Sequence, residues 1–499
     1  MLKLLLACTL LAVATISTAQ PLSPGATIQT VTLPQRESPL IAIRVLFTVG
    51  SIHDPSGKEG LAALTARMVG AASTRRHSYK ELLEALYPMA SSINVSTDRE
   101  VTVFVGEAHT ETLDRYTALL AEVLLEPAFT ESDLQRNREQ LLAYLTSTLR
   151  SANDELLGLE VIQQEVFAGH PYGHSPAGTV VGLKSITLDD VKQFYAQHYT
   201  QSNILLGVAG GYPGNYVSRL QASLAKLAPG KPGLMPLPQP KVPQGRQFTL
   251  VEKKTDSVGI HFAHPLPVTR ADADFYPLLV ANSFLGEHRT FHGRLMNELR
   301  VLRGLNYGDY SYIEYWANPP ATTNPTPNVP RRHQYFSVWV RPVVPANAAF
   351  ALRNALFEVD RLVTRGMTQE EFDLTRQFVV NYSKLWAQTL SNRLGFHLDS
   401  RFYRTPYFID EIDRQLAKLT VADVNRVAKK YLQSEHLRVV MVAAAAPDLK
   451  AMLQAGNATP MKYESQVPAA VSEADKTIQA IPIKAAGIAI VPVAHVFEK

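Results

Sequence analysis

The chain has 499 residues, of which 46% are hydrophobic and 19% are charged. This is the composition of an ordinary globular protein, and the length is sufficient for two or more domains. The net charge of +4 comes from 49 basic and 45 acidic residues spread along the chain, without a basic run interleaved with aromatics. The composition therefore gives no support for nucleic-acid binding.

Residues 1–19 have the pattern of a secretory signal peptide. A positive end at Met1-Leu-Lys3 is followed by an apolar run, Leu4 to Ile16, and by the small residues Ser17-Thr-Ala19. This run is too short to span a membrane, and no later stretch is long and apolar enough. Cys8 is the single cysteine and lies inside the signal, which excludes disulfides and cysteine metal ligands from the mature chain. We expect a periplasmic protein without a membrane span.

Segments in which apolar and polar residues alternate predict strands, and segments with apolar residues at helical spacing predict helices, in a series along the chain. A strand-like run from Leu40 to Val49 precedes a turn, Gly50 to Gly57, and then a short apolar helix, Gly60 to Met68. The sequence also predicts helices over 110–125, 131–149 and 346–365, and strands over 247–251 and 258–263. A Pro-rich loop, 318–332, is expected to be exposed and mobile.

The chain contains an internal duplication. Thr187 and Thr420, 233 residues apart, each have the pattern of a helix N-cap with acidic residues in the first turn, and each helix leads into an apolar strand. Thr130 and Thr368 begin a second matching pair, 238 residues apart. Order and distance are nearly preserved, which indicates two copies of one αβ domain.

The predicted fold is α+β, with two homologous αβ domains in a clam-shell arrangement. Each domain is expected to be a mostly antiparallel sheet with helices packed on one face. Proline and glycine accumulate between the copies, which is typical of a stiff, extended linker. The predicted division is a signal peptide (1–19), an N-terminal domain (20–232), a linker (233–246), a C-terminal domain (247–460) and a C-terminal tail (461–499).

Two motifs carry a resemblance to a known family. The first is the frame Gly50-Ser-x-x-Asp-Pro-x-Gly-Lys-x-Gly-Leu-Ala62, and the second is the turn Gly169-His-Pro-Tyr-Gly173. Together with the duplication, they resemble the pitrilysin/insulinase zinc metallopeptidases, over nearly all of the mature chain. In that family the Gly-Leu-Ala frame leads directly into His-x-x-Glu-His, where two histidines on one helix face hold zinc and the glutamate polarises the metal-bound water.

The chemical positions of that motif are replaced in this chain by Ala63, Ala66 and Arg67. Alanine offers no donor atom, and a guanidinium would bring a fixed positive charge to a cation site. The resemblance therefore implies a degenerate site that holds no metal. Glu155 lies at about the distance of the family's third ligand, so it is either a relic of that ligand or an ordinary acidic residue near a helix start.

Other histidine pairs give weaker metal signals. His170 and His174 are four residues apart, but Pro171 and Gly173 argue against a helix between them. His288 and His292 have the same spacing, and no third ligand is evident beside them.

Arg300 and Tyr307 carry the strongest positive signal. They lie in a segment, Leu299-Arg-x-x-x-Gly-Leu-x-Tyr307, that resembles a family motif whose Arg and Tyr face the zinc across the substrate chamber. There, the pair binds the substrate backbone and the developing oxyanion. The alternative is a buried salt bridge and a core tyrosine.

The resemblance implies the non-zinc subunit of a periplasmic heterodimeric peptidase. In such enzymes a homologous partner carries the zinc, and this chain would contribute Arg300 and Tyr307 to hydrolysis of a peptide substrate. A catalytically silent scaffold or peptide-binding homologue is the alternative from another class, and a self-sufficient peptidase with unrecognised ligands is a third. Arg67 is expected either to meet a substrate carboxylate or to pair with Glu155.

Overall fold

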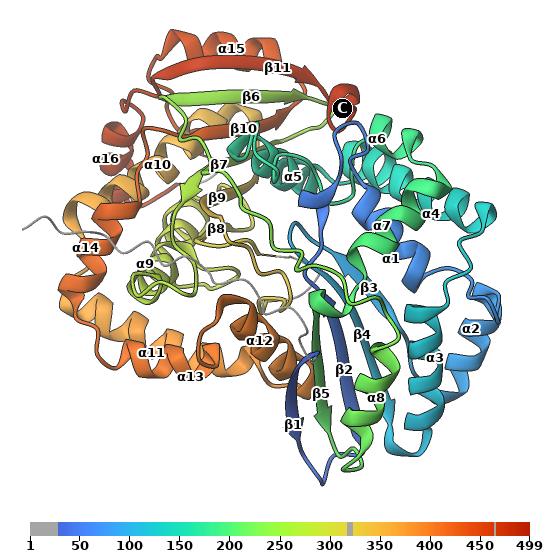
Figure 1. The fold of residues 1–499 in the computed structure, drawn as a ribbon. Coiled ribbons are helices and arrows are strands. Elements are labelled where there is room, and N and C mark those ends of the chain that lie inside the picture. The colour runs from blue at the N-terminus through green and yellow to red at the C-terminus, as the bar shows by residue number, and fades with distance from the viewer. Residues whose placement is uncertain (1–27, 317–322, 464–465) are drawn as a thin grey trace, which may run out of the picture.

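The computed structural model describes residues 28–316, 323–463 and 466–499, and Figure 1 shows them as two αβ halves. The expected signal peptide, residues 1–19, lies outside the described residues. Among the helices in the described ranges, none combines the length and the hydropathy that crossing a membrane would need.

The N-terminal half is built from five strands and eight α-helices among the described residues. The strands are β1 (Gln29–Pro34), β2 (Leu40–Phe47), β3 (Asn94–Thr97), β4 (Thr102–His109) and β5 (Ile204–Gly210). The helices are α1 (Leu61–Gly70), α2 (Tyr79–Leu86), α3 (Leu113–Leu125), α4 (Glu131–Ala143), α5 (Asp154–Val166), α6 (Val180–Ser185), α7 (Leu188–His198) and α8 (Tyr216–Leu224). A π-helical turn, η4 (Tyr144–Ala152), follows α4.

The C-terminal half repeats this plan with one additional strand. Its strands are β6 (Arg246–Glu252), β7 (Val258–Leu266), β8 (Asp309–Tyr312), β9 (Gln334–Val343), β10 (Arg438–Ala443) and β11 (Ala485–Pro492). Its helices are α9 (Phe275–Gly286), α10 (Ala348–Arg365), α11 (Gln369–Trp386), α12 (Leu390–Tyr403), α13 (Phe408–Leu416), α14 (Val421–Tyr431), α15 (Ala446–Ala455) and α16 (Ala469–Ile478). A π-helical turn, η6 (Met296–Val301), follows α9.

The two sheets confirm the duplication. The N-terminal sheet has the order β1-β5-β2-β4-β3, and the C-terminal sheet has the same order, β6-β10-β7-β9-β8, with β11 added beside β6. Among the strands of the described residues, β1–β5, β6–β10 and β6–β11 pair in parallel, and the other pairs of these two sheets are antiparallel. Thr187 and Thr420 cap α7 and α14 through equivalent capping boxes.

Each sheet packs its own helices on one face, as the sequence predicts. Strand periodicity sends alternate side chains to opposite faces. In β2, Ile43 and Val45 point to the helices of their own half, whereas Ala42 and Leu46 belong to smaller clusters that contain side chains of α12.

The second face of each sheet is covered by a helix of the other half. Helix α12 packs on β1, β2 and β5, and α5 packs on β7, β9 and β10, so the halves exchange one helix each. The contact at α5 is close: a Cβ built on Gly158 would lie 2.2 Å from Nε2 of His261 in β7. This exchange makes the two halves one packed unit.

The Pro-rich loop differs from its expected exposure. Residues 317–322 lie outside the described residues, but the end of the loop is buried between the halves. Asn328 donates from Nδ2 to Oδ1 of Asp399 in α12 (3.0 Å), and the side chain of Arg331 is fully buried. The expectation of an exposed loop is therefore wrong for this end, because its polar groups find partners in both halves.

The segments assigned as linker and tail differ in their structure. Residues 233–245 form neither helix nor strand, whereas residues 461–499 supply α16 and β11. The chain then crosses back to the N-terminal half and ends beside α6, where the backbone N–H of Val180 donates to the carbonyl of Phe497 (2.9 Å) (Figure 1). Phe497 is buried in the N-terminal core, so the last residues join the two halves.

Candidate functional site

The turn before α1 is organised by Asp54. Its carboxylate accepts hydrogen bonds from the backbone N–H of Gly60 (2.8 Å) and of Ala62 (2.7 Å), which are free at the start of the helix. His174 lies against the same carboxylate, with Nε2 3.0 Å from Oδ2. Gly60 has a φ of 106° and lies close to Gly178, so both its conformation and its surroundings favour glycine. The motif residues Asp54 and Gly60, together with His174, thus hold α1 in place.

The three degenerate positions lie on α1 against α4. Ala63 and Ala66 are buried. The Arg67 guanidinium extends to α4, where Nε donates to Oδ1 of Asn137 (3.2 Å) and Nη2 donates to Oε1 of Gln140. Burial lowers the pKa of Arg67 from its usual value, although the side chain remains a cation.

The residues around Arg67 do not fit a zinc ion. Two methyl groups, two amides and a guanidinium provide no imidazole, thiolate or carboxylate ligand. Within the described ranges, no cluster of three or more His, Cys, Asp or Glu side chains is arranged to hold a metal.

Glu155 lies on α5, away from this position. Its carboxylate accepts two hydrogen bonds from Arg341 of β9, at 2.7 Å from Nε and 3.2 Å from Nη2. Helices α3, α4, α6 and α7 contact α1, whereas α5 packs on the C-terminal sheet. The structure therefore does not place Glu155 beside Ala63, Ala66 and Arg67, and the alternative in which Arg67 pairs with Glu155 is wrong.

Arg300 and Tyr307 lie together on the surface of the C-terminal half. Arg300 is on the π-helical turn η6, and Gly304, with a φ of 63°, turns the chain back toward it. Arg300 Cζ lies 5.9 Å from the ring centroid of Tyr307 and 5.5 Å from that of Phe291. Tyr307 is 77% exposed and Phe291 is 66% exposed. Tyr307 is therefore not a core tyrosine.

The Arg300 guanidinium is not committed to a carboxylate. Within the part of the chain that the structure describes, it forms no ion pair, and it contacts only Sδ of Met296 (3.9 Å) and the two rings. The alternative of a buried salt bridge does not apply. An unpaired guanidinium beside an exposed phenol leaves several hydrogen-bond donors facing solvent.

Arg341, the partner of Glu155, and Arg300 both act on one buried acid, Asp309. Burial raises the pKa of Asp309 in β8 to about 8, and the cations of Arg341 and Arg300 act in the opposite direction. Asn306 donates to Oδ1 of Asp309 (2.7 Å) and to the carbonyl of Arg341 (2.8 Å). Asp309 and Arg341 were not predicted from the sequence, although a charged residue, Arg341, within the apolar strand run 338–343 is the feature that could have indicated them.

A second group missed from the sequence closes the seam between the halves. Arg331 donates to both carboxylate oxygens of Asp98 (2.7 and 2.6 Å), and Nε of Arg332 donates to Glu100 (2.5 Å). In the sequence, the two adjacent arginines at the end of the Pro-rich loop are the feature that could have indicated these pairs. These pairs join the loop of one half to the start of β4 in the other.

The histidine pairs are used in packing. His170 Nε2 lies 2.9 Å from the carbonyl of Pro238, and His288 Nδ1 lies 2.7 Å from the hydroxyl of Tyr312. His292 lines a surface pocket beside α11. The structure thus places the members of each pair in different surroundings.

Comparison with known proteins agrees with these observations. The family model described as Insulinase (Peptidase family M16) matches residues 30–179, and the model described as Peptidase M16 inactive domain matches residues 185–378. A protein of Helicobacter pylori named "Non-peptidase homolog YmxG" is 24% identical over 414 residues, covering 81% of this chain and 89% of the relative.

Solved structures show the same fold. The peptidase M16 inactive domain from Pseudomonas fluorescens matches with a TM-score of 0.72 at 22% identity, covering 85% of this chain and 97% of that one. A chain of complex III2 from Candida albicans matches with a TM-score of 0.66 at 12% identity, over 91% of this chain and 97% of that one.

These matches fit a catalytically inactive member of a peptidase family. The chain belongs to the insulinase family of M16 peptidases.

Proposed function

We propose that this chain is the non-zinc subunit of a heterodimeric periplasmic peptidase, in which Arg300 and Tyr307 bind the peptide substrate in the site of a zinc-bearing homologue. The main support for this proposal is that both side chains are available to a ligand. The Arg300 guanidinium forms no ion pair among the described residues, and Tyr307 is exposed beside it. A structural pair would be buried and satisfied.

The side chains of Arg300 and Tyr307 provide the hydrogen-bond donors that binding of a peptide substrate needs. A guanidinium supplies a fixed positive charge and several N–H donors, and a phenol supplies one directed O–H donor. Donors of this kind stabilise the oxyanion that develops when a peptide carbonyl is attacked. The zinc itself would be held by the partner, because Ala63, Ala66 and Arg67 provide no ligand set.

The packing of the two halves supports a role for Arg300 and Tyr307 in a complex with a second chain. The inner face of each sheet is already covered by α5 or α12, and the seam is closed by the Arg331–Asp98 pair. The Arg300/Tyr307 pair lies outside this seam, on a surface that a second chain can reach. The periplasmic location rests on the signal pattern of residues 1–19.

Peptide cleavage by the zinc-bearing homologue, measured with and without this chain, tests the proposal. We expect strong activation by the wild-type chain, and a loss of about 10²–10³-fold in kcat with Arg300→Ala, as for removal of an oxyanion donor. Tyr307→Phe removes only the O–H donor and keeps the ring. Arg426→Ala removes an exposed arginine that pairs with Asp274, and it serves as the matched control.

The proposal fails if the homologue is fully active alone, or if the Arg300 and Tyr307 variants activate it as well as the wild type. A stable complex without any effect on cleavage would favour the other candidate, a silent scaffold or peptide-binding homologue. The name of the Helicobacter pylori relative favours that candidate.

A further inference from the structure

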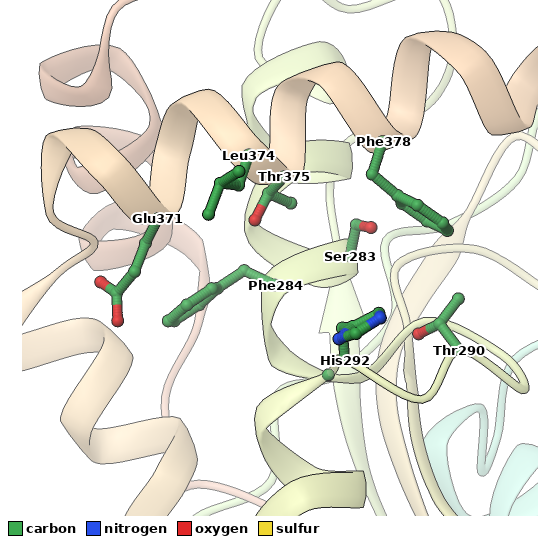
Figure 2. A pocket seen from close by; sticks show the side chains of 9 residues that line it. Ser283, Phe284, Thr290, His292, Glu371, Leu374, Thr375 and Phe378 are labelled. Carbon is green, nitrogen blue, oxygen red and sulfur yellow. The ribbon is translucent and has the colours of Figure 1, made fainter.

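A pocket of about 440 Å³ lies between α9, the loop 287–293 and α11 (Figure 2). Phe284 and Ser283 reach it from α9, and Leu374 and Phe378 reach it from α11 (Figure 2). Glu371 stands at one end, and His292 and Thr290 stand at the other (Figure 2). Gly293 and Thr375 complete the lining.

The internal duplication relates this pocket to the degenerate metal position. In the shared topology, α9 and α11 take the places of α1 and α4, and α11 packs on α9 as α4 packs on α1. The spacing of 238 residues between the copies matches Asn137 with Thr375 and Gln140 with Phe378. In the N-terminal half, a basic side chain, Arg67, occupies the space between the two helices. In the C-terminal half the same helices enclose the pocket.

The polar groups of the pocket are arranged as acceptors. Ser283 Oγ donates its hydrogen to Oε2 of Glu287 (2.7 Å), and Thr290 Oγ1 donates to the carbonyl of Glu287 (3.0 Å). Both hydroxyls then have lone pairs left for a ligand. Glu371 adds a carboxylate, one oxygen of which accepts from the backbone N–H of Thr368 (2.9 Å). The lining contains neither lysine nor arginine.

Glu287 lies behind the lining, in contact with Ser283, and burial raises the pKa of its carboxyl group to about 7. Its side chain is 2% exposed, and Oε1 has no hydrogen-bond partner among the described residues. Glu287 meets the cost of burial by binding a proton more tightly, so the negative charge at the pocket is that of Glu371. The aromatic rings of Phe284 and Phe378 provide apolar walls and faces that attract a cation.

We propose that this pocket binds a lysine or arginine side chain of a peptide, with the alkyl stem along Phe378 and Phe284 and the charged head against Glu371. Long basic side chains bury their stems in this way while their charged ends meet acceptors. The pocket would give the chain a preference for basic residues at one position of its peptide ligand.

The surroundings indicate a peptide as the source of this side chain. His292 at the pocket adjoins Phe291, whose ring lies beside Arg300, and Arg300 lies beside Tyr307. One surface therefore runs from the pocket to the Arg300/Tyr307 pair. The identification of the ligand as a peptide rests on the proposed function, whereas the preference for a basic side chain rests on the pocket alone.

Titration calorimetry on the full chain, without any partner, tests this preference. The probes are two peptides that differ at one position, lysine in one and norleucine in the other, so that the four-carbon stem is kept and the ammonium group is removed. We expect the lysine peptide to bind about tenfold more tightly, as for a charge-assisted hydrogen bond. In Glu371→Gln this advantage should fall to about twofold, since the lining loses its one acidic residue.

Two variants complete the experiment. Glu370→Gln removes the same charge from the neighbouring, exposed position of α11 and should leave the tenfold advantage unchanged. Ser283→Ala removes a hydroxyl on the side of the pocket away from Glu371 and should also leave the advantage unchanged (Figure 2). Glutamine at 371 can still accept the Thr368 hydrogen bond, so the cap of α11 is kept.

The proposal is overturned if neither peptide binds, if the norleucine peptide binds as tightly as the lysine peptide, or if Glu371→Gln and Glu370→Gln behave alike. Tighter binding of spermidine than of the lysine peptide would overturn the assignment to a peptide. Because no partner is present, a failed activation experiment leaves this measurement unaffected. A failed lysine preference likewise leaves the role of Arg300 and Tyr307 untouched.

Discussion

Replacing Arg331 by methionine removes the guanidinium that joins the Pro-rich loop of one half to Asp98 of the other. The pair is bidentate, with N–O distances of 2.7 and 2.6 Å, and the two side chains are 0% and 7% exposed. Methionine keeps an unbranched apolar stem of similar length. The substitution therefore removes the charge with little change in packing.

The expected cost follows from the burial of Asp98. Removing one partner of a buried ion pair leaves the other charge without compensation, which costs roughly 3–5 kcal/mol. Arg99 Nη1 lies 3.8 Å from Oδ1 of Asp98 and would compensate part of this charge, so the low end of the range applies. For a domain of about 200 residues, 1 kcal/mol corresponds to roughly 2–4 °C in Tm, and we expect a decrease of about 6–12 °C.

Thermal unfolding of Arg331→Met is compared with that of Arg76→Met. Arg76 forms a bidentate pair of the same kind with Glu126, at 2.8 and 2.6 Å, but with 63% and 30% exposure. An exposed pair contributes only about 0–1 kcal/mol, so this control should change Tm little. Equal Tm values for the two variants would refute the reasoning that burial between the halves makes the Arg331 pair important.

Two further substitutions test the packing of α5 and the buried acid of β8. Gly158→Ala should destabilise the protein by about 1–3 kcal/mol in urea unfolding, because the new Cβ would lie 2.2 Å from Nε2 of His261. Gly214→Ala, with nothing within 4 Å of the new Cβ, should change stability little, and equal effects would contradict the close contact. Burial raises the pKa of Asp309 to about 8 in the folded state, above its value in the unfolded chain. The folded state therefore binds this proton more tightly. Asp309 stabilises the fold most at low pH, and this contribution is lost as the pH rises from about 4 to 8. Asp309→Asn should weaken this loss by roughly a few kcal/mol between pH 5 and 8, and parallel stability curves for variant and wild type would contradict the shifted pKa.

The duplication was predictable because its signals are local. Thr187 and Thr420 each cap a helix through a residue three positions later, and this pattern is visible in a few letters of sequence. The exchange of α5 and α12 was not predictable. A strand that is buried on both faces has the same continuous apolar pattern whichever helix covers it. The burial of Arg331 was missed for a related reason, since a Pro-rich composition indicates a loop but not what the loop contacts.

The sequence by itself determined which atoms are present at the degenerate site. Ala63 and Ala66 have no donor atom and Arg67 carries a fixed charge, so the sequence alone predicts that these positions do not bind zinc. Only the tertiary structure decided that α4 faces these positions and that Glu155 faces Arg341. It also decided that Tyr307 is exposed beside Arg300. Spacing along the chain determines which side chains share a helix face, whereas the packing of distant elements determines which faces meet.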